Sequence, residues 1–225
     1  MDLADLHPWD VSPKEAVALQ RELAGRVVLR GLPRAVRRVA GADIAVGRGS
    51  KLGTAAVVVL SYPEFEVVEV AIEQAPVTFP YVPGLLSFRE VPVLRRAFEK
   101  LRGPIDLLFV DGQGYAHPRR FGLACHLGLL LDVPAVGVAK SRLLGEHGEP
   151  GTEAGSRADL LDGGETVGAV LRTRPGVRPL FVSVGHRIGL DAAVEWVLRC
   201  GRGYRLPEPA RLADRAAAGR LPERL

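Results

Sequence analysis

The sequence predicts an α/β fold built around one mixed β-sheet with helices on both faces. Three runs rich in Val, Ile and Ala, at 38–46, 54–62 and 66–74, are joined by the turn-type segments 47–50 and 63–64. This spacing predicts an antiparallel meander. Farther along, apolar strands alternate with helical patterns, which is typical of parallel crossover units. No repeat or linker divides the 225 residues, so we expect a single domain over 1–225.

The remaining elements follow from capping signals and periodicity. A capping box at 12–15 opens an amphipathic helix that Gly25 ends. Two prolines in 80–84 predict a stiff loop. The rest is predicted as helices at 87–102, 119–131, 190–200 and 210–219, strands at 105–111 and 133–138, and a hairpin of 167–172 with 180–184.

Composition excludes several classes of protein. The formal charge is 30 − 26 = +4, a mild basic excess that suits a polyanionic partner without requiring one. Cys125 and Cys200 lack C-x-x-C spacing, which argues against a zinc site or a disulfide scaffold. The N-terminus has no signal-peptide pattern, and polar residues interrupt the most apolar stretch, 121–139. We therefore expect a soluble, cytoplasmic protein with no membrane partner.

Asp111 is the most informative residue, because an apolar strand delivers its carboxylate into the glycine-rich turn 111–114. A buried carboxylate needs turn amides or a cation, and the segment alone leaves both open. Asp43 lies mid-strand among small apolar residues, where an acid is uncommon. Glu90 lies near the start of its helix, where the helix dipole also favours a carboxylate.

These three acids converge if the strand ending at Asp111 pairs with the first meander strand. Both aspartates then lie at one end of the sheet, and Glu90 reaches them from the neighbouring helix. Three converging carboxylates repel one another without a cation, and oxygen ligands with open positions suit Mg²⁺ or Mn²⁺. Such ions promote phosphodiester hydrolysis by activating water.

Eight segments in order resemble the endonuclease V family, the deoxyinosine-directed repair nucleases of the ribonuclease H-like superfamily. The similarity extends from about Gly41 to Asp214. The segments are Gly41-Ala-Asp43, Pro80-Tyr-Val-Pro-Gly84, Phe88-Arg-Glu90, Val110-Asp-Gly-Gln-Gly114, Ala116-His-Pro-Arg119, Gly137-Val-Ala-Lys-Ser141, Ser183-Val-Gly-His186 and Tyr204-Arg-Leu-Pro-Glu-Pro209. The resemblance implies a ribonuclease H-like mixed sheet, an antiparallel meander plus parallel strands, flanked by helices on both faces.

The resemblance also implies the metal site. Asp43, Glu90 and Asp111 would bind Mg²⁺, for which Mn²⁺ would substitute, and Asp214 would lie beside the metal. From the residues alone, Asp214 is instead a surface acid on a helix. Lys140 fits a phosphate contact that offsets charge in the transition state.

Further residues are candidates for contact with the nucleic acid. His117 is a candidate for phosphate contact or proton transfer, although a lone histidine is more often structural. Ser141, Arg119 and His186 are candidate phosphate contacts, with solvated or loop-closing roles as the alternatives for Arg119 and His186.

Recognition of the damaged base is expected around 80–84. By resemblance Tyr81 is the wedge that enters the duplex, and the alternative is a hydrophobic plug on the core. Glycines would leave space for a flipped base. The expected pocket and backbone residues are Pro80, Val82, Pro83, Gly84, Gly112, Gly114 and Gly122.

The function implied is hydrolysis of a phosphodiester on the 3′ side of a deaminated base, chiefly deoxyinosine in DNA, at the second bond. The alternatives are a related nuclease acting on inosine-containing RNA or branched DNA, and a non-catalytic module that binds lesions. A nucleotide-metabolising enzyme is excluded because the turn 111–114 lacks the G-x-x-x-x-G-K-[ST] pattern. We expect a monomer.

Overall fold

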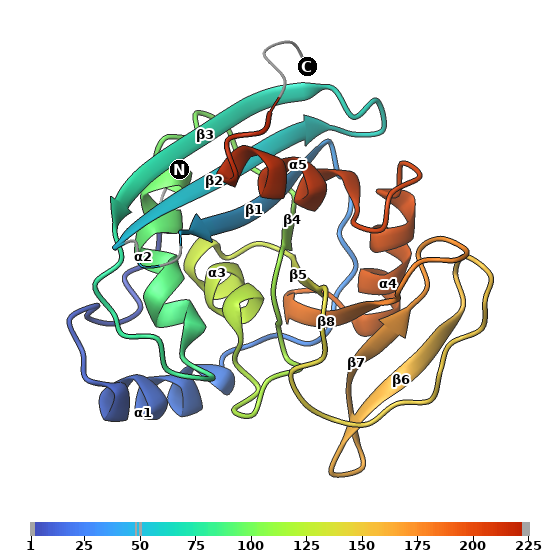
Figure 1. Ribbon diagram of the computed structural model, residues 1–225, viewed down its shortest axis with the longest axis horizontal. Helices are drawn as coiled ribbons and strands as arrows, with labels where there is room; N and C mark the ends of the chain where they lie inside the picture. Colours follow the sequence, from blue (N-terminus) through green and yellow to red (C-terminus); the bar gives the residue numbers. More distant parts are fainter. Residues whose placement is uncertain (1–2, 48, 50, 222–225) are drawn as a thin grey trace.

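Eight strands form one mixed sheet within residues 3–47, 49 and 51–221, which the computed structural model describes (Figure 1). The helices are α1 (Pro13–Ala24), α2 (Leu86–Glu99), α3 (Leu123–Leu131), α4 (Leu190–Arg199) and α5 (Glu208–Ala217). The strands are β1 (Arg38–Val46), β2 (Leu52–Ser61), β3 (Val67–Pro76), β4 (Leu107–Val110), β5 (Ala135–Ala139), β6 (Arg157–Asp162), β7 (Glu165–Leu171) and β8 (Leu180–His186).

The strand order is β3-β2-β1-β4-β5-β8-β7-β6. The first three strands form the predicted antiparallel meander, and β1, β4 and β5 are parallel neighbours. The hairpin of β7 and β8 is also confirmed. The predicted mixed α/β architecture is therefore correct, and the parallel part of the sheet consists of β1, β4 and β5.

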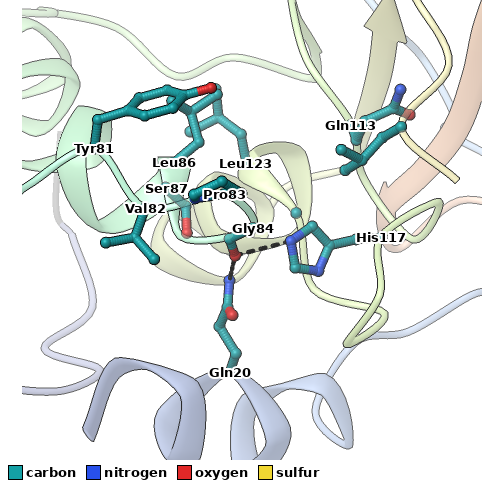
Figure 2. Close-up of a pocket in the computed structure, with 12 residues that line it drawn as sticks. Gln20, Tyr81, Val82, Pro83, Gly84, Leu86, Ser87, Gln113, His117 and Leu123 are labelled. Atoms are coloured by element: carbon teal, nitrogen blue, oxygen red, sulfur yellow. Dashed lines mark hydrogen bonds between the residues drawn. The ribbon is translucent and has the colours of Figure 1, made fainter. Parts of the chain in front are cut away.

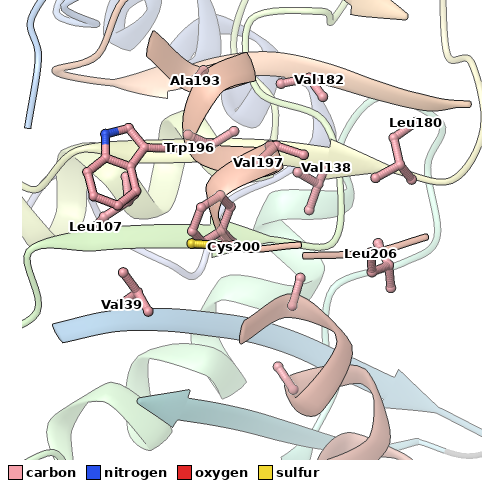
Figure 3. Close-up of a cluster of buried hydrophobic side chains, with 14 of the residues drawn as sticks. Val39, Leu107, Val138, Leu180, Val182, Ala193, Trp196, Val197, Cys200 and Leu206 are labelled. Atoms are coloured by element: carbon pink, nitrogen blue, oxygen red, sulfur yellow. The ribbon is translucent and has the colours of Figure 1, made fainter. Parts of the chain in front are cut away.

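Alternate residues along the strands pack against helices on opposite faces of the sheet. One face buries Val39 and Leu107 against Trp196 and Val197 of α4, together with the inner side of α5 (Figure 3). The other face packs against α2 and α3. In β1, Val39 and Ala40 fall in different clusters, as the two-residue period of a strand requires. Both faces are covered along the central strands β1, β4 and β5, which leaves the ends of these strands as positions for a site.

Helix α1 confirms the capping prediction. Ser12 accepts a hydrogen bond from the Glu15 backbone, the Glu15 side chain accepts one from Ser12, and Gly25 is the C-cap. The helix docks through its apolar face beside α3 and the loop before α2.

Three details differ from the sequence-based prediction. Helix α3 begins at Leu123 rather than at residue 119, because Arg120 has a left-handed φ of 55° that a helix cannot contain. Helix α2 ends at Glu99, three residues early. Strand β6 was not predicted, although Gly163-Gly164 is a hairpin signal between it and β7.

Two earlier predictions fall partly on residues that the structure does not describe. Arg48 and Ser50 of the first meander turn, and Met1 and Asp2 of the N-terminus, lie outside the described residues. Cys125 and Cys200 are both buried and free, as expected. None of the described helices is long and apolar enough to cross a membrane.

Candidate metal centre and base pocket

The pairing of β1 with β4 brings two aspartates to the same end of the sheet. Ala42 lies opposite Val110 in parallel register, and the next residues are Asp43 and Asp111. The backbone N–H of Asp111 donates to the carbonyl of Ala42 at 3.2 Å, which extends the pairing of β1 with β4 to Asp111. The convergence predicted for these two acids is therefore observed.

A third carboxylate joins them from α5. Oxygen atoms of Asp43, Asp111 and Asp214 all lie within 4.8 Å of one another. Helix α5 reaches this position because it packs directly on the backbone of β1. A Cβ at Gly41 would lie 1.9 Å from the carbonyl oxygen of Pro209, so only glycine permits the approach. Asp214 is thus part of an acidic cluster rather than an isolated surface acid.

Lys140 follows the last residue of β5 and points into the same cluster. Its Nζ lies 2.5 Å from Asp111 Oδ2 and 2.6 Å from Asp214 Oδ1. Burial alone would lower the pKa of Lys140, but its hydrogen bonds to the two carboxylates outweigh that effect and the pKa is raised. The ammonium is therefore firmly charged at neutral pH and offsets part of the negative charge.

Burial and mutual repulsion disfavour the ionised acids. Burial, followed by the charge of Asp111, raises the pKa of Asp43 to about 7. Burial raises the pKa of Glu90 to about 8, with further contributions from the charges of Asp43 and Asp111. Burial also raises the pKa of Asp111, although Lys140 opposes the change. An additional cation would stabilise the ionised forms of these acids.

The donor set fits a hard divalent cation. It consists of carboxylate oxygens, contains no described thiol or imidazole, and is only partly neutralised by Lys140. Glu90 is not in the 4.8 Å group, but the charges of Asp43 and Asp111 act on it, so it faces the same site from α2. The structure thus places Asp214 closer to the two aspartates than the sequence-based hypothesis did, and Glu90 farther away.

A pocket of about 150 Å³ lies between the loop 81–84 and the segments around Gln113 and His117 (Figure 2). A cavity of this size in another protein holds a benzene ring, so the pocket admits one planar base. The lining residues are Gln20, Tyr81, Val82, Pro83, Gly84, Leu86, Ser87, Gln113, His117, Gly122, Leu123 and Leu143. Ser87 lies one helical turn before Glu90, and Gln113 lies two residues after Asp111. The pocket and the acids therefore share two short segments of chain.

Tyr81 stands at the rim of this pocket. Its side chain is 73% exposed, which excludes the interpretation of Tyr81 as a buried plug. The loop that carries it ends at Gly84, which has a φ of 77°. A Cβ there would meet only the end of the Arg119 side chain, at 2.6 Å from Nη2, so it is the backbone conformation that favours glycine.

His117 and Arg119 bind the same loop. His117 Nε2 donates to the Gly84 carbonyl at 3.0 Å, and its Nδ1 accepts from the Arg119 backbone at 3.2 Å. Burial lowers the pKa of His117 to about 4, so the ring is neutral at pH 7. Arg119 Nη2 also donates to the Gly84 carbonyl, at 2.6 Å. Both side chains therefore shape the pocket wall.

Residues 21–215 match the sequence model of the Endonuclease V family. The chain belongs to the endonuclease V family. The endonuclease V of Dehalococcoides mccartyi is 55% identical over 213 residues, which cover 95% of this chain and 96% of that protein. The solved endonuclease V of Streptomyces avermitilis is 46% identical with a TM-score of 0.89, over 94% of this chain and 93% of that one.

A further structure contains nucleic acid. It is endonuclease V of Ciona intestinalis in complex with a 24-mer DNA containing an inosine followed by a ribo-adenosine. That protein is 28% identical to this chain with a TM-score of 0.80, over 92% of this chain and 95% of that one. By its family, this chain is a nuclease and hence a hydrolase.

The other predicted site residues of this endonuclease V do not all face the pocket. A Cβ at Gly114 would lie 2.1 Å from the Val184 carbonyl oxygen, so β8 rather than a base fills that space. Gly112 faces the Leu123 side chain. Pro80 contributes to a different surface hollow beside α2. Of the four glycines predicted to leave room for a base, Gly84 and Gly122 line the pocket.

His186 lies at the opposite end of the sheet from the acids. It pairs with Ala135 at the start of β5, whereas Lys140 follows the end of that strand. Its Nδ1 accepts from the Val28 backbone at 3.2 Å, and its side chain is 4% exposed. The structure therefore does not bring His186 to the acidic cluster.

Ser141 is exposed beside Lys140, and its carbonyl accepts from Gln113 Nε2 at 3.0 Å.

Six lining residues were not among the site residues that the sequence-based hypothesis named: Gln20, Leu86, Ser87, Gln113, Leu123 and Leu143. Gln20 carried a signal, because it is a polar residue on the inner face of α1, between Ala16 and Leu23 at helical spacing. Leu143 carried none that we can identify, since it is an apolar residue in an irregular segment.

Proposed function

We propose that this endonuclease V recognises deoxyinosine and other deaminated bases in DNA and hydrolyses a phosphodiester on the 3′ side of the lesion. The observation that carries the proposal is that one short turn serves both a pocket and an acidic cluster: Asp111 belongs to the cluster, and Gln113 lines the pocket. Cleavage at the second bond beyond the lesion is supported by the family resemblance. It requires the pocket and the acids to be offset from each other along the DNA strand.

The lesion enters the pocket as a flipped base. Tyr81, exposed at the rim, fills the gap that the base leaves in the stack and so offsets part of the cost of unstacking. Gly84 and Gly122 line the pocket, but the space beside each is occupied by protein atoms: a Cβ at Gly122 would lie 2.4 Å from the Gln113 carbonyl oxygen. A deaminated base is unpaired or weakly paired, which lowers the cost of flipping and contributes to selectivity.

The cleavage site is formed by Asp43, Asp111 and Asp214, with Glu90 facing them. Mg²⁺ or Mn²⁺ held by these carboxylates would supply an activated water and stabilise charge on the phosphate. Lys140 lies at the same end of the sheet and stabilises negative charge on the phosphate oxygens as the ester bond breaks. Ser141 follows Lys140 and is a candidate for contact with the same backbone.

In this proposal His117 and Arg119 have a structural role. Both ring nitrogens of His117 are engaged, and Arg119 donates to the pocket wall through Nη2. They are better suited to holding the loop around Gly84 than to proton transfer or phosphate contact. The earlier predictions for these two residues, and for His186, stay predictions.

Inosine-containing RNA is the second candidate substrate. The Ciona intestinalis relative is solved with DNA in which a ribo-adenosine follows the inosine. Incision of matched deoxyinosine and inosine oligonucleotides, with the same sequence and a single modified position, decides the preference of this chain.

The central experiment is incision of an end-labelled duplex that contains one deoxyinosine. We expect nicking with Mg²⁺, none with EDTA, and none with the Asp111→Ala protein. Denaturing gels against a sequence ladder locate the cut. Equal nicking of the unmodified duplex, or nicking that survives EDTA, contradicts the proposal.

A further inference from the structure

Gln20 is buried where an apolar residue is expected. It lies on the inner face of α1 between Ala16 and Leu23, and it is 1% exposed. A buried amide is retained only if its donors and acceptor are satisfied. Gln20 lies one residue before the segment that matches the family model, in a helix that carries none of the recognised motifs.

The amide of Gln20 connects α1 to the loop at Gly84 (Figure 2) and to the segment 119–121. Its Nε2 donates to the carbonyl of Gly84 at 3.0 Å and to the carbonyl of Phe121 at 3.1 Å. Its Oε1 accepts from Arg119 Nε at 2.5 Å. The Gly84 carbonyl receives His117 and Arg119 as well, so three side chains converge on one backbone atom.

The two carbonyls bound by Gln20 belong to two chain segments that contribute to the lining of the base pocket. Gly84 ends the loop that carries Tyr81, Val82 and Pro83. Phe121 precedes Gly122, which lines the pocket as the N-cap of α3. The Gln20 amide bonds to both segments at once, whereas His117 and Arg119 reach Gly84 from the second segment alone, so Gln20 also ties both segments to α1.

Helix α1 does not depend on this amide for its attachment. Ala16 packs with Phe79 and Phe88 on one side of Gln20, and Leu23 packs with Phe121 and Cys125 on the other. The hydrogen bonds of Gln20 therefore define the shape of the pocket more than they anchor the helix.

We propose that Gln20 is a positioning residue that sets the width of the base pocket and thereby the discrimination between deaminated and normal bases. The inference rests on the proposed function, since it takes the pocket as the base site. Gln20 takes no part in the hydrolysis and acts through Gly84 and Phe121.

Two variants separate the bonds of Gln20. Gln20→Met keeps the size of the side chain and removes every hydrogen bond. Gln20→Glu keeps the acceptor for Arg119 but replaces the donor that faces the two carbonyls. Gln74→Met, at an exposed glutamine on β3, is the matched control for the chemical change.

Binding is measured by fluorescence anisotropy in EDTA, on deoxyinosine and unmodified duplexes. We expect both Gln20 variants to bind the deoxyinosine duplex roughly tenfold more weakly, the effect of leaving a buried carbonyl without its donor. Affinity for the unmodified duplex should be unchanged. The single-turnover incision rate at saturating enzyme should stay within about twofold of wild type, because the acids are untouched.

Hydrogen exchange of the protein without DNA gives a readout that does not involve the substrate. Faster exchange confined to 82–86 and 121–124 in the Gln20 variants, with exchange in the strands unchanged, supports the positioning role. Unchanged exchange in these segments, or unchanged discrimination between the duplexes, overturns the inference. A wild-type protein with no preference for deoxyinosine would instead overturn the proposed function, while hydrogen exchange still decides whether Gln20 positions the two segments.

Discussion

Lys140 Nζ lies 2.5 Å from Asp111 Oδ2 and bridges that carboxylate to Asp214. The bridge spans β4, β5 and α5, so one lysine links three elements that are distant in sequence. It supplies a positive charge to a site that contains the carboxylates of Asp43, Asp111 and Asp214. The same ammonium is close enough to the acids to act on a phosphate bound there.

Lys140→Met should lower incision by about 10²–10³-fold, the usual effect of losing one group that stabilises transition-state charge. Single-turnover kinetics at saturating enzyme measure it. Lys140→Arg should not restore the rate, because a planar guanidinium cannot replace a compact ammonium between two carboxylates. Lys14→Met, at an exposed lysine on α1, is the control. Wild-type rates in Lys140→Met would remove the lysine from the mechanism.

Asp43→Ala and Asp111→Ala should each lower incision more than about 100-fold while binding of the deoxyinosine duplex is retained. Each variant loses a cation ligand and leaves the base pocket intact. Nicking and gel-shift affinity are measured on the same preparation. Asp191→Ala, which removes an exposed acid on α4, should behave as wild type. Loss of binding in parallel with loss of nicking would mean that the acids also maintain the pocket.

The stability of the metal-free protein should fall as pH rises. The pKa of Asp43 is raised from 3.8 to about 7 and that of Glu90 from 4.5 to about 8, so folding takes up protons between these values. Below about pH 6.5 the buried histidines, whose pKa values are lowered, oppose this effect. Above that pH they are neutral in both states, so the folded state binds more protons than the unfolded state and the free energy of unfolding decreases with pH.

Thermal melts in EDTA at about pH 7 and about pH 8.5 measure the effect above the titration range of the histidines, with the lower Tm expected at the higher pH. Mg²⁺ should raise the Tm most at the higher pH, because it binds the ionised acids. An Asp43→Asn/Glu90→Gln protein should show a flatter dependence. A Tm that rises with pH in EDTA would mean that these carboxyls ionise readily in the folded protein.

Tyr81→Ala should weaken binding to the deoxyinosine duplex with little change in Tm. The side chain is 73% exposed, so its removal costs little folding stability, whereas base stacking contributes about 1–3 kcal/mol. Phe88→Ala is the contrasting variant, since its ring is 1% exposed and its loss costs about 3–5 kcal/mol of folding stability. Unchanged affinity of Tyr81→Ala for both duplexes would rule out the wedge.

Gly41→Ala should separate α5 from β1. The new Cβ would lie 1.9 Å from the Pro209 carbonyl oxygen, so the helix must shift and carry Asp214 with it. We expect a loss of about 1–3 kcal/mol in folding stability and a fall in incision. Urea unfolding and nicking assays measure the two effects. Gly148→Ala is the control, because no atom lies within 4 Å of a Cβ there. Unchanged stability would show that α5 does not need this contact.

The sequence by itself determined the sheet, most elements and the two central acids. Periodicity predicted β1, and the apolar run before Asp111 predicted β4, because burial on both faces leaves a direct mark on residue type. The capping box fixed the start of α1. Once β1 and β4 are parallel neighbours, Asp43 and Asp111 must emerge together, so this part of the site follows from local patterns.

Local patterns did not predict the positions of Asp214 and Gln20, although the family resemblance implied that Asp214 lies beside the metal. Asp214 lies on a helix whose sequence reads as an exposed surface, and it joins the acids because Gly41 admits α5 onto β1. Gln20 acquires its role from carbonyls 64 and 101 residues away. Such contacts depend on how helices dock on the sheet, and docking is set by side-chain packing between distant segments, which no local pattern in the chain records.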